Sequence, residues 1–383
     1  INTIDLLAGN CMGLSNMEYD FLFDRSQNLL SIGYYAEERR RDNGYYDLLA
    51  SEARLTTLVA IAQGKLPQES WFALGRQLTK MGTTPILLSW SGSMFEYLMP
   101  LLVMPTYDNT LLDQTNRTIV EKQIEYGKKR GIPWGISESG YNMVDTSLNY
   151  QYRAFGVPGL GLKRGLSEDL VISPYSTIMA LMVAPEDAFS NLQELREAGF
   201  ESKYGFYEAI DYTPSRLPRK QTHAVVKSFM AHHQGMSFLS LSYLLLDKPM
   251  QRRFEMDVEI KATLLLLQEK VPRVSTFYSP VVHAEDISAV PFTDTSMRVI
   301  TTPNTAIPEV ELLSSRWKNI AITRWREDST CDNWGTFCYI RDLETNAFWS
   351  TAYQPTQQQA QNYEAVFTQG RAEFRRRDLS LDT

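Results

Sequence analysis

Between positions 47 and 272, apolar residues return every three or four places, which is the spacing of amphipathic helices. The clearest helical segments are 47–64, 114–131, 185–199, 224–246 and 259–270. Pro67 and Pro185 stand where helices are expected to begin, and Gly64, Gly131 and Gly199 stand where helices are expected to end. This part of the chain is therefore predicted to be mainly α.

The pattern changes near position 279. Short runs of alternating apolar and polar residues follow, separated by Asn, Asp and Pro, which is typical of antiparallel strands. These runs are 297–302, 319–325, 336–342 and 347–353. Residues 271–282 carry two prolines and no amphipathic period, so they are predicted to be a linker. We expect a helical domain at 1–278, followed by the N-terminal part of an antiparallel β-sandwich at 279–383.

Composition and charge exclude several classes of protein. Hydrophobic residues make up 43% of the 383 positions, which is enough to fill a large globular core. A net charge of −7 argues against a nucleic-acid partner, and the arginine runs at 39–41 and 375–377 are interpreted as solvated or ion-paired. The longest aliphatic run, 237–246, is interrupted by Ser and Tyr, so no direct membrane insertion by this chain is expected.

Cofactor and metal motifs are not recognised in the sequence. Cys11, Cys331 and Cys338 cannot all pair and do not cluster with histidine, so they are interpreted as reduced thiols in a cytoplasmic setting. His232 and His233 lack the spacing of a metal site. The glycine-rich segment 156–165 lacks the register of a phosphate-binding loop. We therefore expect no metal and no cofactor.

Three segments, 133–142, 204–214 and 230–237, place acidic or imidazole side chains among aromatic residues or Gly, and segment 150–165 is rich in Tyr, Phe and Gly. Aromatic rings stack on pyranose faces, while carboxyl groups protonate or attack the glycosidic bond. The pattern is typical of a sugar-binding cleft. The stacking candidates are Trp90, Trp134, Tyr141, Tyr152 and Tyr207, and the candidates for contacts with sugar hydroxyls are His232 and His233.

Glycoside cleavage needs two carboxyl groups on opposite sides of the anomeric carbon. The candidates are Asp42, Asp47, Glu52, Glu96, Glu138, Asp145 and Glu208. Glu138 stands first because it lies in a turn rich in Trp, Gly and Ser, although a carboxylate held at a helix N-terminus would have similar neighbours. Glu52 is expected inside a helix, where partial burial would raise its pKa and suit it to proton donation. A surface ion pair with Arg39 or Arg54 is the alternative.

Three further acidic residues lie in aromatic-rich surroundings. Asp42 and Glu208 are predicted to bind sugar hydroxyls, and either could replace Glu52 in the catalytic pair. Glu96 is interpreted instead as a structural cap or brace.

Taken in order, six motifs resemble the glucoamylase-like domain of bacterial cyclic β-1,2-glucan synthases. They are RRRDNGYYDLLASEARL (39–55), LLSWSGSMFEYLMPLL (87–102), PWGISESGYN (133–142), FGVPGLGLKRGL (155–166), YGFYEAIDYTP (204–214) and MAHHQGMS (230–237). The resemblance extends from about residue 15 to residue 273, and residues 315–342 resemble the beginning of the cellobiose-phosphorylase-like domain that follows in those synthases. The segment 311–317 lacks that family's Gly-rich strand and turn, so no phosphorylase catalytic residue is assigned.

The resemblance implies an (α/α)6 barrel that cyclises linear β-1,2-glucan by retaining transglycosylation, with Glu138 as nucleophile and Glu52 as general acid/base. It also implies that other domains of a larger synthase polypeptide are partners, at the cytoplasmic face of the bacterial inner membrane. Two alternatives remain, namely an inverting endo-β-1,2-glucanase on the same fold and a non-catalytic glucan-binding module. The strand region is predicted not to support phosphorolysis, and either to pack on the helical domain through Trp317, Trp325 and Trp334 or to expose an apolar patch.

Overall fold

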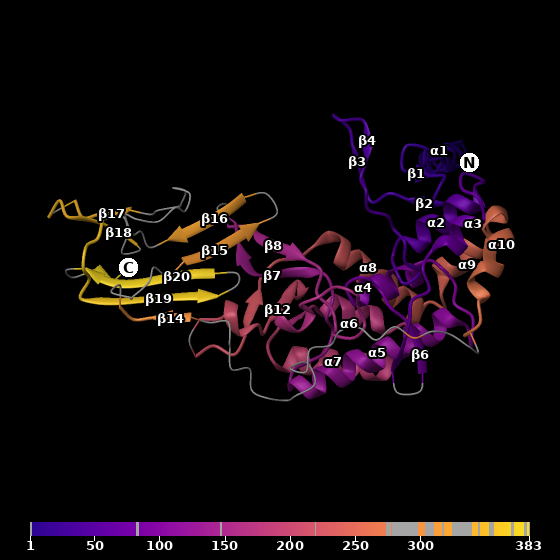
Figure 1. The fold of residues 1–383 in the computed structure, drawn as a ribbon. Coiled ribbons are helices and arrows are strands. Elements are labelled where there is room, and N and C mark those ends of the chain that lie inside the picture. The colour runs from indigo at the N-terminus through magenta and orange to yellow at the C-terminus, as the bar shows by residue number, and fades with distance from the viewer. Residues whose placement is uncertain are drawn as a thin grey trace. The chain divides into compact units, whose positions relative to one another are not determined.

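The structure, a computed structural model, divides the chain into two compact units (Figure 1). The helical unit comprises residues 1–212 and 223–289, and the strand unit comprises residues 213–222 and 290–383. The structure describes residues 2–81, 84–145, 148–218, 220–272, 277, 298–302, 310–315, 318–323, 339–343, 345–351, 356–368, 371–378 and 381–382.

Helices are the longest elements of the helical unit. They are α1 (Asn2–Ser15), α2 (Arg54–Ala62), α3 (Glu69–Ala73), α4 (Met94–Leu98), α5 (Leu111–Arg130), α6 (Pro174–Ala180), α7 (Pro185–Glu197), α8 (Ala231–Leu245), α9 (Pro249–Met256) and α10 (Val258–Thr263). Shorter 3₁₀ segments are η1 (Met99–Leu102), η2 (Leu166–Glu168) and η4 (Leu264–Gln268), and η3 (Pro214–Arg216) belongs to the strand unit.

Short antiparallel strands lie between these helices. They pair as β1 (Phe23–Asp24) with β2 (Leu29–Leu30), β3 (Tyr34–Tyr35) with β4 (Arg40–Arg41), β5 (Leu78–Met81) with β6 (Thr84–Leu87), β7 (Ser139–Val144) with β8 (Tyr150–Arg153), and β10 (Glu201–Ser202) with β11 (Gly205–Phe206). A three-stranded sheet has the order β13 (Ala224–Val226), β12 (Ala209–Asp211), β9 (Val171–Ile172). The sequence analysis did not predict these strands, because all except the six-residue β7 have only two to four residues, which are too few to show an alternating period.

The predicted helices at 114–131 and 185–199 are confirmed as α5 and α7. Gly131 and Gly199 follow them with positive φ angles of 67° and 81°, a conformation that favours glycine. Thr110 caps α5 by accepting a hydrogen bond from the Asp113 amide at 3.2 Å, and Pro185 is the first residue of α7. Local sequence signals therefore set both ends of these helices.

Three predicted helices differ from the structure. The segment 47–64 is helical only from Arg54, so the prediction that Glu52 lies inside a helix is wrong. The segment 224–246 begins as strand β13, because residues 224–226 pair with β12 before α8 starts at Ala231. The segment 259–270 divides into α10 and η4. Pro67, where a helix was expected to begin, lies two residues before the start of α3.

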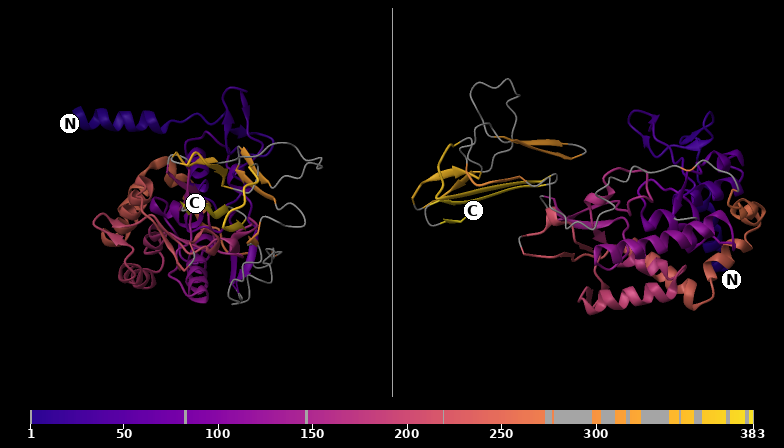
Figure 2. Two further views of the ribbon diagram at one scale, coloured as in Figure 1. Left: turned by 90° about the vertical axis from the view of Figure 1, so that its left-hand side faces the viewer. Right: turned by 60° about the horizontal axis from the view of Figure 1, so that its bottom comes forward.

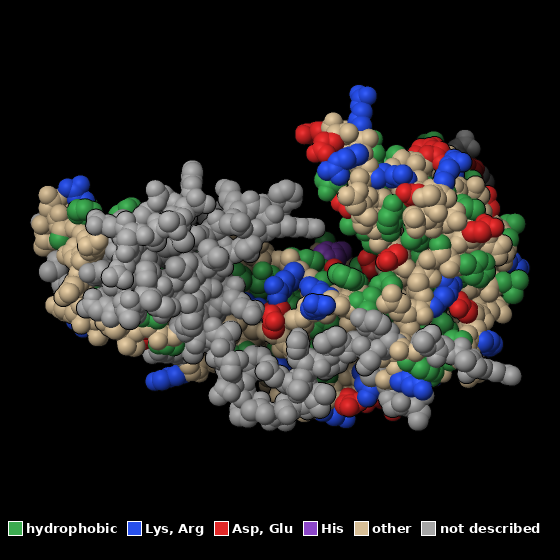
Figure 3. Space-filling view, viewed as in Figure 1, with side chains coloured by type: hydrophobic (Ala, Val, Ile, Leu, Met, Phe, Trp, Pro, Cys, Tyr) green, Lys and Arg blue, Asp and Glu red, His purple; other side chains and the backbone are tan. Residues whose placement is uncertain are grey.

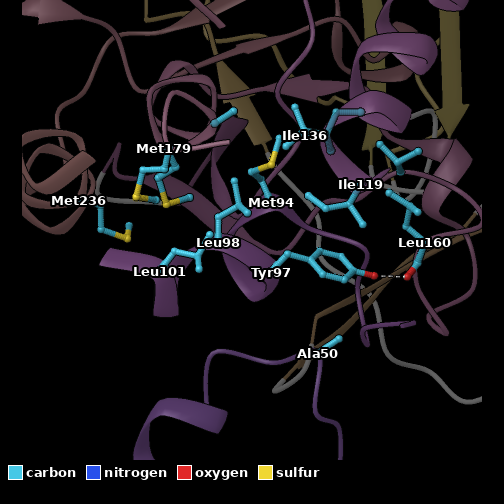
Figure 4. Close-up of a cluster of buried hydrophobic side chains, with 14 of the residues drawn as sticks. Ala50, Met94, Tyr97, Leu98, Leu101, Ile119, Ile136, Leu160, Met179 and Met236 are labelled. Carbon is cyan, nitrogen blue, oxygen red and sulfur yellow. Dashed lines mark hydrogen bonds between the residues drawn. The ribbon is translucent and has the colours of Figure 1, made fainter. Parts of the chain in front are cut away.

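The hydrophobic core of the helical unit gathers side chains from α4, α5, α6 and the loops around them (Figure 4). The fully buried Tyr97 of α4 donates a hydrogen bond to the Leu160 carbonyl at 2.8 Å. Its hydroxyl also accepts from the Ser89 amide at 3.0 Å. Tyr97 thereby joins the loop before α4 to the glycine-rich segment 156–165.

That glycine-rich segment packs backbone against backbone. A Cβ atom on Gly156 would lie 1.8 Å from the Ser91 carbonyl oxygen, and one on Gly161 would lie 2.6 Å from the Ser91 carbonyl carbon. Only glycine fits such an approach. These glycines therefore pack the loop that precedes α4.

Helix α1 extends away from the body of the helical unit (Figure 2). Its apolar side chains are exposed, for example Ile4 by 71% and Leu14 by 81%. Cys11, a free cysteine, is also exposed there.

The strand unit contains antiparallel pairs. Its four-stranded sheet has the order β14 (Arg298–Ile300), β19 (Asn362–Thr368), β20 (Arg371–Asp378), β21 (Leu381–Asp382). Two hairpins pair β15 (Val310–Ser315) with β16 (Lys318–Thr323) and β17 (Tyr339–Arg341) with β18 (Phe348–Ser350). The predicted change to antiparallel strands is therefore confirmed for the described part of this region.

The two arginine runs take part in ion pairs, as predicted. In the first run, Arg40 pairs with Glu38 at 2.5 Å. In the second, the buried Arg376 pairs with Asp378 at 2.5 Å and donates to the Ser350 carbonyl at 2.8 Å.

Several sequence predictions fall on residues outside those that the structure describes. These are Trp317, Trp325, Trp334, Cys331, Cys338 and the predicted linker at 271–282 apart from positions 271, 272 and 277. Within the described ranges, every helix is too short or too polar to cross a bilayer. In the same part of the chain, His, Cys, Asp and Glu side chains form no group of three or more that could hold a metal ion.

Candidate active site

Glu138 lies at a bend directly before β7, in a segment that buried polar side chains hold in place. Gln123 of α5 donates to the Ile136 carbonyl and accepts from the Ile136 amide, both at 2.9 Å. The Tyr175 hydroxyl, from α6, donates to the Glu138 carbonyl at 2.9 Å. Because these partners stand on helices, the Glu138 backbone has a rigid support.

Glu52 lies in the turn that leads into α2. The buried side chain of Arg54 anchors this turn by donating to the carbonyl oxygens of Ser51 and Glu96 at 3.1 Å and to that of Tyr97 at 2.6 Å. Arg54 therefore does not form the surface ion pair that was considered for Glu52, because its guanidinium group is buried and binds backbone carbonyls.

Glu52, Glu96 and Glu138 interact electrostatically and are called the carboxylate cluster below. Burial, followed by the negative charges of Glu52 and Glu96, raises the pKa of Glu138 to about 7, while Lys163 opposes this shift. Burial also raises the pKa of Glu52, and the charge of Glu96 adds to the effect. The pKa of Tyr46 is raised by burial and then by the negative charges of Glu52 and Glu138, so this phenol lies within electrostatic range of both carboxyl groups.

Glu96 has a structural role, as interpreted from the sequence, and the structure shows that it caps helix α4. With Ser93 it forms a capping box, in which the Glu96 amide donates to Ser93 Oγ and the Ser93 amide donates to Glu96 Oε2. Its carboxylate also accepts from the Trp90 amide at 3.1 Å and from the Ser89 hydroxyl at 3.0 Å. This 6% exposed carboxylate is thus held by the loop that it organises.

A second buried group lies beside the segment that carries Glu138. Glu208 Oε2 is 3.0 Å from His233 Nδ1, and Glu208 Oε1 accepts from the Gly140 amide at 3.1 Å. The Tyr152 hydroxyl lies 3.3 Å from His233 Nε2. The imidazole of His233 stacks on the Tyr175 ring with 3.6 Å between centroids. Glu208, His233 and Tyr152, predicted separately as sugar contacts, therefore form one connected group.

Tyr175, Glu208 and His233 also line a cavity of about 140 Å³, together with aromatic and aliphatic side chains that include Tyr207 and Phe238. Figure 3 shows a histidine side chain recessed on one face of the helical unit, with acidic side chains beside it. Of the acidic and imidazole groups in the sequence motifs, Glu208 and His233 thus meet at one cavity.

The remaining predicted site residues lie in varied surroundings. Trp134 is only 7% exposed and packs in the hydrophobic core, so the structure does not favour its predicted stacking on a sugar ring. Trp90 is 61% exposed, and the ring of Tyr141 contacts the edge of Phe155. Tyr207 packs near Phe229.

Two of the predicted sugar contacts remain, and they differ in their surroundings. Asp42 accepts hydrogen bonds from the Tyr35 hydroxyl at 2.8 Å and the Gly44 amide at 2.9 Å, which stabilise its own loop. His232 is exposed, and its pKa is lowered by partial burial and by neighbouring His233.

Sequence reasoning missed four residues that organise the site. Lys163 acts electrostatically on Glu138, the charge of Glu138 raises the pKa of Tyr46, and Arg54 and Tyr175 hold the backbone around the carboxylate cluster. Tyr46, Arg54 and Lys163 lie in the quoted motifs, which was an available signal. Tyr175 lies outside these motifs, and only the tertiary structure reveals its contact.

A cluster of carboxyl groups in which the pKa values of Glu52 and Glu138 are raised, near aromatic rings and on a helical scaffold, matches the class of site found in glycoside-cleaving enzymes. Comparison with known proteins agrees. Residues 44–256 match the family described as "Putative glucoamylase", and residues 294–383 match "Glycosyl hydrolase 94, supersandwich domain". The chain belongs to this glucoamylase-like family, and the resemblance of its motifs is confirmed.

Among curated relatives, the chain is 42% identical over 376 residues to the cyclic beta-(1,2)-glucan synthase NdvB of Rhizobium meliloti (strain 1021). That match covers 94% of this chain and 13% of the length of the relative.

Two solved structures have a similar fold. A protein from Bacteroides fragilis NCTC 9343 described as a "putative glucoamylase" has a TM-score of 0.50 at 18% identity, and the match covers 69% of this chain and 64% of the chain of that protein. A beta-1,2-glucanase from Parabacteroides distasonis has a TM-score of 0.50 at 15% identity, and the match covers 66% of this chain and 39% of the chain of that protein. At these identities the likeness concerns the fold alone.

Proposed function

We propose that the helical unit cleaves linear β-1,2-glucan and transfers the glycosyl group to a hydroxyl of the same chain, which gives a cyclic product with retained configuration. The 42% identity to a protein named as a cyclic β-(1,2)-glucan synthase supports this choice of substrate. The observation that carries the chemistry is the electrostatic interaction of Glu52 with Glu138, two partly buried carboxyl groups of the same site.

The proton affinity of Glu138 favours a different assignment of roles from the one that the sequence analysis expected. With a pKa of about 7, Glu138 is partly protonated at neutral pH and can serve as general acid/base. Glu52 is then the nucleophile. In the first step Glu52 bonds to the anomeric carbon, while Glu138 gives its proton to the departing glycosidic oxygen. In the second step the Glu138 carboxylate takes the proton of the acceptor hydroxyl, whose oxygen displaces Glu52.

Product analysis tests the reaction. Incubation of the chain with linear β-1,2-glucan should yield rings without new reducing ends. Short linear products of inverted configuration would support the endo-β-1,2-glucanase alternative. Binding without turnover, unchanged in Glu138→Gln, would support the non-catalytic module.

Azide tests the assignment of the two carboxyl groups. With an activated aryl β-glycoside, Glu138→Ala should be rescued by azide to give the β-glycosyl azide, because Glu52 still forms the intermediate. Glu52→Ala should give the α-glycosyl azide, because azide then attacks the anomeric carbon directly. The opposite pair of products would reverse the roles and restore the original assignment.

The proposal includes the wider setting of the chain. We propose that the helices belong to an (α/α)6 barrel, with a boundary near residue 278, and that residues 279–383 have a structural role as part of a phosphorylase-like β-sandwich. The chain would work within a larger synthase polypeptide at the cytoplasmic face of a bacterial inner membrane. No glucose 1-phosphate should form from β-1,2-glucan and inorganic phosphate, and release that depends on residues 279–383 would contradict this structural role.

A further inference from the structure

Glu208, His233 and Tyr152 form a hydrogen-bond chain to which the two-carboxylate reaction assigns no part. The chain begins at a pair that is almost fully buried, since the side chains of Glu208 and His233 are each 1% exposed. It ends at Tyr152, which is 41% exposed. A buried acid and imidazole therefore connect to a phenol at the surface of the site.

The contacts of Glu208 favour one direction of donation along the hydrogen-bond chain. Both oxygens of Glu208 face donors, because Oε1 accepts from the Gly140 amide at 3.1 Å and Oε2 lies 3.0 Å from His233 Nδ1. The proton of a neutral His233 then resides on Nδ1, and its Nε2 is an acceptor. Tyr152, 3.3 Å from this nitrogen, therefore donates its hydroxyl proton inward. The free lone pair of the Tyr152 oxygen remains available as an acceptor.

Two further contacts link the hydrogen-bond chain of Glu208, His233 and Tyr152 to Glu138. The His233 ring stacks on Tyr175 at an interplanar angle of 10°, and the Tyr175 hydroxyl donates to the Glu138 carbonyl at 2.9 Å. Burial, followed by the charges of Glu138 and Glu208, raises the pKa of Tyr152, so its phenol stays neutral and does not act as a base. The chain consequently orients a hydrogen-bonding group beside the carboxylate cluster.

We propose that Tyr152 accepts a hydrogen bond from a hydroxyl group of the glucosyl unit bound beside Glu138, and that Glu208 and His233 are positioning residues that orient it. The inference rests on the proposed function, because it takes a glucan as the ligand. It replaces the predicted direct sugar contacts of Glu208 and His233, because the contacts of both Glu208 oxygens and of His233 Nδ1 are to protein atoms. No covalent bond forms or breaks in this contact.

A double-mutant cycle in the full chain tests the inference. Tyr152→Phe removes the acceptor oxygen. In Glu208→Gln, an amide group facing His233 would shift the imidazole proton to Nε2, which would then donate to the Tyr152 oxygen and occupy it. Each variant should lower kcat/KM on linear β-1,2-glucan by about 10- to 100-fold, and the double variant should fall no further than the worse single variant. Independent, additive losses, or full activity in Glu208→Gln, would overturn the inference.

Tyr107→Phe is a matched control, because it removes a tyrosine hydroxyl that lies 3.3 Å from the carboxylate of Glu255 elsewhere in the helical unit. It should leave kcat/KM unchanged. Thermal unfolding of each variant identifies any loss that comes from misfolding, and Glu208→Asp, which keeps the charge, should recover part of the activity lost in Glu208→Gln. Failure of that recovery in a folded protein would contradict the positioning role.

A measurement without turnover separates the inference from the proposed function. Nitrogen-15 NMR of the four histidines should show that His233 is protonated on Nδ1 in the wild type and on Nε2 in Glu208→Gln. The variant His233→Asn identifies the His233 signal, because that signal is missing from its spectrum. A wild-type His233 protonated on Nε2 would overturn the inference even if the glucan reacts. A wild type that leaves the glucan unchanged would instead overturn the proposed function.

Discussion

Nη2 of the buried Arg54 donates a hydrogen bond to the Tyr97 carbonyl at 2.6 Å and thereby joins the start of α2 to α4. Nη1 of the same side chain reaches Ser51, beside Glu52, and the carbonyl of Glu96. The relative positions of Glu52 and Glu96 therefore depend on one guanidinium group inside the protein.

Replacement of Arg54 by Met should lower the free energy of unfolding by about 3–5 kcal/mol, because buried carbonyl oxygens lose their donor. Urea denaturation measures this change. Arg252→Met is the matched control, since Arg252 pairs with Asp247 at the surface with side-chain exposures of 57% and 84%. The control should change stability by about 1 kcal/mol or less. Similar losses in the two variants would show that Arg54 does not anchor the turn.

The rate of glucan conversion should fall at alkaline pH with an apparent pKa of about 7, because Glu138 must be protonated to act as the general acid. The value belongs to the whole carboxylate cluster, since its members titrate together. Glu138→Gln should remove this limb of the pH–rate profile and lower the rate by roughly 10²- to 10⁴-fold. A limb that persists in the variant would assign the titration to another group.

Glu138 should also make stability depend on pH. Its pKa in the folded protein, about 7, lies above the ordinary value of 4.5, so between these values the folded form binds more protons than the unfolded form. The free energy of unfolding therefore falls as the pH rises through this window. Glu138→Gln should stabilise the protein at pH about 8 by roughly 1–3 kcal/mol and have little effect at pH about 4. Equal effects of the substitution at both pH values would argue against a raised pKa.

Glu96→Gln should destabilise the protein by about 2–4 kcal/mol, because an amide group would face donors such as the Ser91 and Ser93 amides. Loss of the negative charge should also lower the pKa of Glu138 and move the alkaline limb to lower pH. Denaturation and pH–rate profiles measure the two effects. Glu197→Gln, on the exposed end of α7, is the control and should change neither. If Glu96→Gln is as stable as the wild type and the alkaline limb of its pH–rate profile does not move, Glu96 does not belong to the carboxylate cluster.

Gly156→Ala should destabilise the helical unit by about 1–3 kcal/mol or more, because the new Cβ would lie 1.8 Å from the Ser91 carbonyl oxygen and force two backbones apart. Gly9→Ala in α1 is the matched control, because no atom lies within 4 Å of its added Cβ. The control should be neutral or stabilising by up to about 1 kcal/mol. The difference in unfolding midpoint is the measurement, and equal midpoints would disprove the close approach.

The sequence by itself was sufficient for features that depend on neighbouring residues. Helices α5 and α7 have their periodic apolar faces, their initial signals and their terminal glycines within one segment, so they could be predicted. The strand region has a local alternating pattern and was predicted as well. The motifs that carry Glu52, Glu138 and Glu208 likewise indicated a sugar-acting family, because the motif residues are close together in the chain.

Only the tertiary structure decided how these segments meet. Glu52 lies outside α2, and the buried Arg54 at the start of this helix binds carbonyls of the distant α4, which no local period reveals. The pKa of Glu138 depends on burial and on charges brought together from other segments. His233 and Glu208 are 25 positions apart, and both could be predicted as polar residues of a cleft. Their pairing inside the protein became visible only in three dimensions, because hydrogen bonds and desolvation depend on distances that sequence order does not specify.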